Sequence, residues 1–191
     1  MRMILTGLPG AGKGTQAHLL AQFLELPHIS TGDLFRQHIA DRTELGQTAK
    51  TYINSGELVP SDITVAMVRD RLGANDVASG FILDGFPRTV DQAMALDELL
   101  SDTLGPLDAV LDFTVSEQTV LNRMLARGRA DDTDDVIRTR LRIYNEENEP
   151  LLHHYSSILC SIDAEGEVED VHTRVVRALG ERLSPSRPGT N

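Results

Sequence analysis

Short apolar runs along the chain alternate with longer segments in which apolar residues recur every three or four positions. A short apolar run bounded by turn residues predicts a buried strand, whereas recurrence every three to four residues predicts a helix with one apolar face. The expected strands are residues 2–6, 28–29, 81–83, 109–115 and 158–162. The expected helices include residues 15–24, 90–100 and 168–183, one that begins near residue 61 and a long one that begins near residue 133.

Because strands alternate with helices, the pattern predicts an α/β fold in which a five-stranded parallel sheet is covered by helices on both faces. Right-handed crossover connections then give a doubly wound, three-layer sandwich. In such a fold ligands bind at the carboxyl ends of the strands. Each unusual loop of this chain follows a predicted strand, so the candidate chemistry is expected at that edge of the sheet.

Residues 30–59 are predicted to form short helices joined by Gly46 and Gly56. We interpret this stretch as a small helical subdomain inserted into a core made of residues 1–29, 60–126 and 133–183. A polar loop at residues 127–132 interrupts the core, and residues 184–191, rich in Ser, Pro and Gly, are expected to be a flexible tail. The methionines expected to fill the core are Met3, Met67, Met94 and Met124.

Composition and charge argue against several classes of protein. The 191 residues carry a formal net charge of −11, which disfavours binding of nucleic acid or an acidic membrane by the surface as a whole. No apolar run approaches the roughly 18 residues that span a membrane. The single cysteine, Cys160, excludes an internal disulfide and a cysteine-caged zinc site. We therefore expect a cytoplasmic protein.

The strongest motif comes directly after the first predicted strand, at residues 7–15 (GLPGAGKGT), and opens a helix. Glycines allow consecutive backbone N–H groups to turn toward an anion, and the helix N-terminus adds partial positive charge. This is the context of a phosphate-binding loop, in which Lys13 reaches the β- and γ-phosphates and Thr15 serves the metal. Gly14 separates these two residues, which restricts the match to a subset of phosphate-loop proteins. A glycine-rich turn without a ligand is the less favoured alternative.

A second motif follows the strand at residues 81–83, where the chain continues as DGFPR to residue 88. In a phosphate-loop fold the aspartate at the end of such a strand, here Asp84, holds Mg²⁺ directly or through water. Gly85 allows a ligand to approach closely, and Pro87 stiffens a turn that presents Arg88. Taken alone, Asp84 would be interpreted as a turn cap; together with the glycine-rich loop, the metal interpretation is favoured.

Arginines crowd the stretch from residue 123 to residue 142. A phosphoryl-transfer site needs such cations, because negative charge develops on the non-bridging oxygens during the reaction. The alternative is a solvated face on which the arginines pair with nearby aspartates. We expect a mixture, in which Arg123, Arg127, Arg129 and Arg140 serve the site and Arg138 and Arg142 are structural or lie on the surface.

With these residues the sequence closely resembles the adenylate kinases, of the nucleoside-monophosphate kinase family, over almost its whole length. The resemblance rests on residues 7–15 with the extra glycine, on residues 30–33 (STGD) with Arg36, on residues 81–88 with Gln92, and on the arginine-rich stretch. It implies a P-loop NTPase fold and Mg²⁺-dependent phosphoryl transfer from ATP to AMP, which gives two ADP. Residues 30–59 would then be the NMP-binding subdomain and residues 127–132 a short lid, as in the short-lid bacterial form.

The resemblance also implies roles for individual residues. The implied ATP-binding residues are Gly10, Ala11, Gly12, Lys13, Gly14, Thr15, Arg127 and Gly166. The implied AMP-binding residues are Thr31, Arg36, Glu57, Leu58, Val59, Gly85, Phe86, Pro87, Arg88, Gln92, Arg129 and Arg140. The implied catalytic residues are Lys13, Asp84, Arg88, Arg123, Arg129 and Arg140. Mg²⁺ would be held mainly by nucleotide phosphates and water near Thr15 and Asp84, no zinc is expected, and we expect a monomer.

Two other functions stay open at this point. A UMP/CMP kinase shares most of the motifs, but Thr31 and Gln92 favour adenine by resemblance, because the pyrimidine enzymes tend to carry Ala and Asn there. A nucleotide-dependent switch would use the same loop for regulation, but it does not need Arg88 and the arginine cluster in its own chain. The leading expectation is an adenylate kinase that maintains and salvages adenine nucleotides, with ATP, AMP and ADP as its small-molecule partners.

Overall fold

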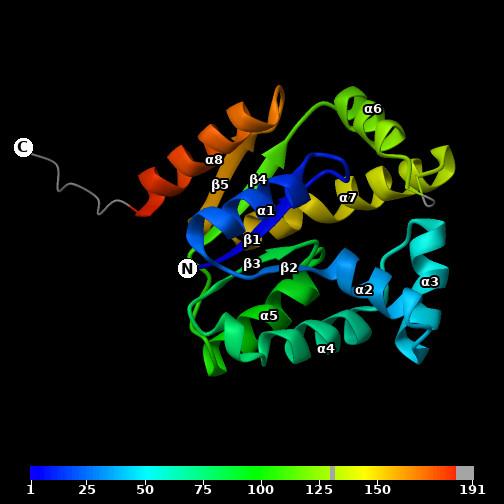
Figure 1. The fold of residues 1–191 in the computed structure, drawn as a ribbon, viewed down its shortest axis with the longest axis horizontal. Helices are drawn as coiled ribbons and strands as arrows, with labels where there is room; N and C mark the ends of the chain where they lie inside the picture. The colour runs from blue at the N-terminus through cyan, green and yellow to red at the C-terminus, as the bar shows by residue number, and fades with distance from the viewer. Residues whose placement is uncertain (130–131, 184–191) are drawn as a thin grey trace, which may run out of the picture.

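The structure is a computed structural model that describes residues 1–129 and 132–183 (Figure 1). Its strands are β1 (Arg2–Gly7), β2 (His28–Ser30), β3 (Phe81–Asp84), β4 (Ala109–Thr114) and β5 (Leu159–Asp163). Its α-helices are α1 (Lys13–Leu24), α2 (Thr31–Ala40), α3 (Glu44–Ser55), α4 (Ser61–Leu72), α5 (Val90–Asp102), α6 (Glu117–Arg127), α7 (Asp134–His154) and α8 (Val168–Leu183). Short 3₁₀ helices are η1 (Asn75–Val77) and η2 (Ser156–Ile158). The tail expected at residues 184–191 lies outside the described residues.

The sheet has the strand order β2-β3-β1-β4-β5, and all neighbouring strands are parallel. β1 lies at the centre, where Leu5 pairs with Asp84 of β3 on one side and with Leu111 of β4 on the other. The chain first fills the β2 and β3 side of β1 and then the β4 and β5 side. This confirms the predicted doubly wound α/β fold. The change of direction beside β1 opens a crevice at the carboxyl ends of the strands, where ligands bind in such folds.

Alternate residues of β1 point to opposite faces of the sheet, and both faces are buried. Met3 and Leu5 belong to an apolar cluster with α1 and α8, whereas Ile4 belongs to a second cluster with α4 and α5. None of these three residues is more than 2% exposed. Figure 1 accordingly shows α1 and α8 on one side of the sheet and α4 and α5 on the other. These layers fix the ends of β1 and β3, on which the candidate site is built.

Helices α2 and α3 form a hairpin beside the carboxyl ends of the strands, coloured light blue to cyan in Figure 1. Their starts are encoded locally, because the Ser30 hydroxyl accepts from the backbone N–H of Asp33 and the Thr43 hydroxyl from that of Gly46. A side chain at Gly46 would collide with the backbone of His38, so glycine lets the two helices approach closely. A small apolar cluster joins the hairpin to α4. The hairpin occupies the predicted inserted subdomain, whose boundaries stay a prediction.

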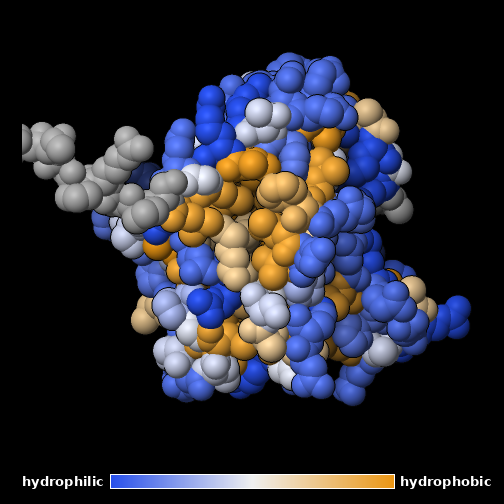
Figure 2. Space-filling model, turned by 60° about the vertical axis from the view of Figure 1, so that its left-hand side comes forward, coloured by the Kyte–Doolittle hydropathy of each residue, from blue (hydrophilic) through white to orange (hydrophobic). Residues whose placement is uncertain are grey.

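Most of the surface is polar, but Figure 2 shows an apolar area in the middle of the face that it presents.

Among the methionines expected in the core, Met3, Met67 and Met124 are buried. Met94 is 59% exposed, so that prediction is wrong. The reason is the helical rotation of about 100° per residue, which turns Met94 outward when its neighbour Ala93 faces the core. No helix within residues 1–129 or 132–183 is long and apolar enough to cross a membrane.

Candidate active site

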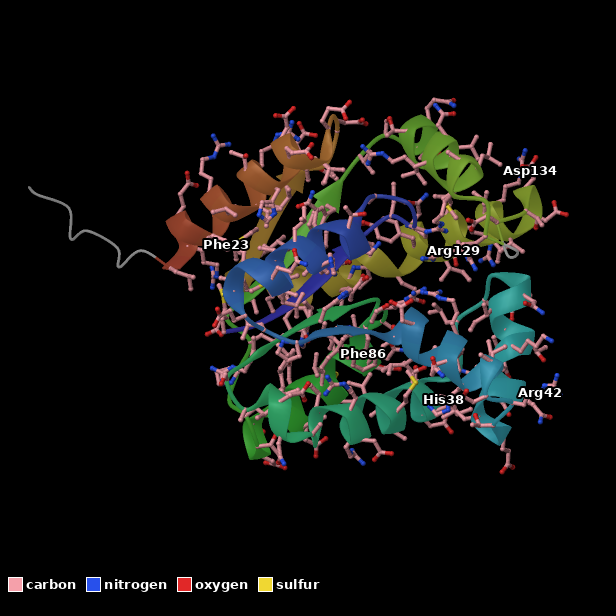
Figure 3. The ribbon with its side chains drawn as sticks, in the orientation of Figure 1. Phe23, His38, Arg42, Phe86, Arg129 and Asp134 are labelled. Carbon is pink, nitrogen blue, oxygen red and sulfur yellow. The ribbon has the colours of Figure 1, made fainter. Side chains whose placement is uncertain are left out.

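A cleft of about 1300 Å³ lies at the carboxyl ends of the strands. It is lined by the glycine-rich loop, the turn after β3, the start of α2 and one side of α7. Small-molecule pockets usually enclose roughly 300–1,000 Å³, so this cleft exceeds the usual size for one ligand. All of the predicted site residues line it except Phe86. The Phe86 side chain is 1% exposed and lies in the apolar core on the side of α4 and α5 (Figure 3).

The glycine-rich loop connects β1 to α1 through backbone conformations that favour glycine. Gly10 and Gly12 have φ values of +90° and +95°, in the left-handed region where other side chains are strained. At Gly10 a Cβ atom would also lie 2.8 Å from Cγ of Met124, so glycine lets the loop pass close to α6. Because α1 begins at Lys13, the free N–H groups of its first turn lie directly after the loop. This arrangement can bind an anion.

Lys13 carries the positive charge of this loop. Its Nζ donates to the carbonyl oxygens of Gly7 and Leu8, at 2.6 and 2.9 Å. Burial lowers the pKa of Lys13 to about 8; the carboxylate of Asp84 opposes this shift and the Arg88 guanidinium adds to it. The cation therefore lies between its own loop and the end of β3, beside the cleft.

Asp84 provides a carboxylate on the strand next to β1. Its Oδ2 lies 3.7 Å from Nε2 of His28 and would lie 3.6 Å from a Cβ atom at Gly14 in the glycine-rich loop. Burial raises the pKa of Asp84, but the contact with His28 and the charge of Lys13 outweigh it, so the pKa lies below its ordinary value. Mg²⁺ prefers carboxylate oxygens as protein ligands, and this carboxylate faces the glycine-rich loop.

Three arginines from different elements face a common part of the cleft: Arg36 of α2, Arg88 of the turn after β3, and Arg140 of α7. Arg88 Nε donates to the carbonyl oxygen of Gly85 at 2.8 Å. Desolvation by the surrounding walls of the cleft lowers the pKa of Arg88, although the residue itself is exposed; Asp84 opposes this shift, and Arg140 and Arg36 add to it. Guanidinium groups that repel one another in this way favour an anion between them, and a phosphate dianion fits that requirement.

The other residues that were predicted to bind AMP also line the cleft, except Phe86. Thr31 is buried, and its hydroxyl donates to the carbonyl oxygen of Asp84 at 3.3 Å. Gln92 is only 2% exposed and lies in the first turn of α5. The link between α3 and α4 contributes residues 57–59. The end of β3 and the start of α2 are therefore joined by a hydrogen bond at the bottom of this region.

Asp132 accepts hydrogen bonds from Arg127 and Arg129 of the predicted lid and from Arg140 of α7. Its carboxylate accepts from Nε and NH2 of Arg127 at 3.0 and 2.9 Å, and from NH1 of Arg140 at 3.2 Å. It also accepts from the backbone N–H of Arg129 at 3.3 Å, and its side chain is only 1% exposed. The pairing of arginines with aspartates was the alternative to a phosphate site; here both hold, since these arginines also line the cleft. Residues 130–131 of the predicted lid lie outside the described residues.

Arg123 connects the glycine-rich loop to the loop after β5. Its terminal nitrogens donate to the carbonyl oxygens of Ala164 at 3.1 Å, Gly166 at 3.2 Å and Ala11 at 3.4 Å. Gly166 has a φ of +95°, in the left-handed region that favours glycine. Arg142, which was expected to be structural or on the surface, forms an exposed ion pair with Glu146. Arg123 therefore holds two walls of the cleft together.

Comparison with known proteins agrees with this geometry. A family model described as adenylate kinase matches residues 5–159. An adenylate kinase of Nocardia farcinica is 58% identical over 180 residues, which cover 94% of this chain and 99% of the relative. Adenylate kinases of Corynebacterium aurimucosum and Mycolicibacterium vanbaalenii are 58% and 55% identical with the same coverage. The chain belongs to the adenylate kinase family.

The predicted activity is thereby confirmed: this adenylate kinase is an ATP:AMP phosphotransferase, whose substrates are ATP, AMP and ADP. Adenylate kinases generally use Mg-ATP. Across residues 1–129 and 132–183, no group of three or more His, Cys, Asp and Glu side chains could hold a metal by itself.

Two polar residues that hydrogen-bond to residues of the cleft were not identified from sequence. Asp132 was considered only as a partner of a solvated arginine face, and its burial between Arg127 and Arg140 has no local sequence signal. Ser61 lies where a helix was expected to begin, and its hydroxyl accepts from Nε2 of Gln92 at 3.1 Å. Both contacts join residues from different elements, which the apolar pattern does not encode.

Proposed function

We propose that this adenylate kinase binds its two substrates on two sides of the one cleft. The phosphates of ATP would bind the glycine-rich loop with Lys13, and its base would lie near Arg127 and Gly166. AMP would bind between Thr31, Arg36, residues 57–59, residues 85–88 and Gln92. The observation that carries this proposal is that the loop after β1 and the turn after β3 line the same cleft. The strands that carry them are adjacent and parallel, so donor and acceptor phosphates would meet between them.

Catalysis would then consist mainly of positioning and charge stabilisation. Lys13, Arg88, Arg129 and Arg140 would surround the transferring phosphoryl group and stabilise the charge on its oxygens. The convergence of Arg36, Arg88 and Arg140 on one region supports the acceptor side of this assignment. Arg123 would act at the ATP side by holding the loop at residues 164–166 against the glycine-rich loop.

We propose Mg²⁺ as the cofactor, bound together with ATP. Asp84 fits this ion, because its carboxylate is ionised at neutral pH and faces the glycine-rich loop. Thr15, which also lines the cleft, would be the second protein group near the metal. When bound, Mg²⁺ would neutralise charge on the β- and γ-phosphates. The protein would hold it mainly through water and the phosphates.

The division into parts is proposed as the sequence suggested it, with residues 30–59 as the NMP-binding subdomain and residues 127–132 as the short lid. The hairpin of α2 and α3 has its own helix caps, which supports treating it as a unit, and a small apolar cluster joins it to α4. Closure of the lid would exclude water, so that the phosphoryl group passes to AMP and not to water. We further propose that the enzyme acts as a monomer in the cytoplasm.

The experiment that tests the proposed function is an acceptor panel. The protein is incubated with ATP and Mg²⁺, alone or with AMP, UMP or CMP, and the nucleotides are separated by anion exchange. We expect two ADP for each AMP consumed and little product from UMP or CMP. Product mainly from UMP or CMP would keep the fold and the chemistry but overturn the assignment of Thr31 and Gln92. Slow release of phosphate without any acceptor would instead indicate a switch-like protein.

A further inference from the structure

Two hydrogen bonds tie Gln92 to the turn that precedes α5. Its Oε1 accepts from the backbone N–H of Arg88 at 2.9 Å, and its own backbone N–H donates to the Thr89 hydroxyl at 3.3 Å. A threonine followed three residues later by a glutamine is the pattern of a capping box, in which the glutamine reaches back to a free N–H before the helix. From these contacts alone, Gln92 would be interpreted as a capping residue of α5.

A third contact goes beyond capping, because it comes from another helix. Nε2 of Gln92 donates to the hydroxyl of Ser61, the first residue of α4, at 3.1 Å. Gln92 is 2% exposed and yet lines the cleft. An amide oxygen has two lone pairs and an amide nitrogen two hydrogens, so each atom retains one position for a ligand.

The backbone N–H of Arg88 determines which way the amide points. This group can only donate, so the atom that faces it must be the acceptor, Oε1. The reversed amide would place the Nε2 hydrogens against a second donor and would lose that hydrogen bond. The Ser61 hydroxyl can donate or accept, so it does not choose the direction. It holds the nitrogen end in place once the direction is set.

We propose that Ser61 is a positioning residue that helps the enzyme to select the base of the acceptor nucleotide. Its hydrogen bond keeps the Gln92 amide in one orientation, so that the Oε1 acceptor and the Nε2 donor have fixed positions toward that base. This inference rests on the proposed function, in which Gln92 contacts the base of AMP. These fixed positions suit a base that presents an amino group beside a ring nitrogen acceptor, as adenine does. A 6-oxo purine of the same size presents an acceptor where adenine presents the amino donor.

The test compares AMP with IMP, because the two nucleotides differ in this donor and acceptor pattern and hardly in shape. The values of kcat/KM for AMP and IMP are measured at saturating Mg-ATP in wild type, Ser61→Ala and Ser61→Thr. Ser101→Ala serves as the matched control, because Ser101 is an exposed serine of the same helix as Gln92. Gln92→Ala tests the proposed AMP site itself. Thermal unfolding verifies that each variant folds.

In Ser61→Ala we expect kcat/KM for AMP to fall about three- to tenfold, the effect of one neutral hydrogen bond. The preference for AMP over IMP should fall as well, because an amide held only through its oxygen can tilt away from the geometry that matches the amino group and ring nitrogen of adenine. The KM for ATP should change by less than about twofold, since Ser61 lies on the acceptor side. Ser61→Thr keeps the hydroxyl and should keep the preference, and Ser101→Ala should behave as wild type.

Two kinds of result would overturn the inference: one leaves the proposed AMP site intact, and the other contradicts that site as well. If Gln92→Ala loses AMP activity but Ser61→Ala keeps both the activity and the preference for AMP over IMP, Ser61 does not position the amide, and the proposed AMP site stands. Equal losses for AMP and IMP in Ser61→Ala would likewise reduce Ser61 to a structural contact. If Gln92→Ala leaves AMP use unchanged, the proposed AMP site itself is wrong.

Discussion

The Nζ atom of Lys13 lies 2.6 Å from the carbonyl oxygen of Gly7, so the first residue of α1 is bonded to the last residue of β1. The lysine therefore closes the glycine-rich loop from the inside and brings a positive charge to the cleft at the same time. The loop can adopt this path because Gly10 and Gly12 occupy left-handed conformations. Structure and chemistry of the loop thus depend on the same side chain.

Lys13→Met should lower kcat about 10²–10³-fold, the cost of losing one donor that stabilises the transition state. Methionine fills a similar volume, so the thermal unfolding curve should show a folded protein. Lys50→Met is the matched control, because Lys50 is the other lysine of the sequence and is exposed on α3. Steady-state kinetics with ATP and AMP measures the effect. Near-normal turnover in a folded Lys13→Met variant would remove Lys13 from the mechanism.

The lowered pKa of Lys13 predicts how activity depends on pH. Burial brings this pKa down to about 8, so the free enzyme loses the charge of Lys13 as the pH rises through about 8. Because the protonated amine is the form that binds phosphate, kcat/KM for ATP should fall on the alkaline side of that pH. Lys13→Arg keeps a guanidinium charged throughout this range, so its alkaline limb should move upward. An unchanged limb in Lys13→Arg would assign the titration to another group.

Arg88→Ala should weaken AMP more than ATP, because Arg88 lies with Arg36 and Arg140 on the proposed acceptor side. A hydrogen bond to a charged group contributes about 1.5–3 kcal/mol, which corresponds to roughly 10- to 150-fold in AMP affinity. Titration calorimetry with AMP and with ATP measures both affinities. Arg71→Ala is the control, since Arg71 lies in the last turn of α4, forms an ion pair with Asp76 and does not line the cleft. Equal loss of both affinities in Arg88→Ala would contradict the placement of Arg88.

Local sequence was sufficient to predict the strands and loops that carry the site. The apolar run at residues 2–6 and the glycines that follow it predict β1 and its loop, because burial and backbone freedom are properties of those residues themselves. The apolar run at residues 81–83 likewise predicts β3 and places Asp84 at its end. The doubly wound arrangement then follows from the alternation of strands and helices, since crossover handedness leaves few other topologies.

Contacts between distant segments could not be predicted in the same way. Asp132 is buried because α6 and α7 bring Arg127 and Arg140 to it from both sides, and nothing at residue 132 itself indicates this. Ser61 meets Gln92 because α4 packs beside α5. Met94 was expected inside because methionine is apolar, whereas the rotation of α5 decides its position. These outcomes depend on how elements pack, which a pattern along one element does not contain.

The burial of Asp132 between two arginines predicts that it stabilises the fold more than an exposed ion pair does. Asp132→Asn keeps the shape of the side chain but removes the charge that compensates Arg127 and Arg140, whose side chains are only 32% and 15% exposed. We expect the free energy of unfolding to fall by about 1–3 kcal/mol, measured by urea denaturation. Glu146→Gln is the matched control, because it removes the same charge from an ion pair whose side chains are 57–59% exposed.

The control should change stability by no more than about 0.5 kcal/mol, as solvent screens an exposed pair. Asp132→Asn should also lower kcat, since the proposed phosphate contacts of Arg140 depend on the position that Asp132 gives it. Asp132→Glu retains the charge on a longer side chain, so it should recover part of the stability. Equal, small losses in Asp132→Asn and Glu146→Gln would mean that Asp132 is no more than a surface partner of the lid arginines.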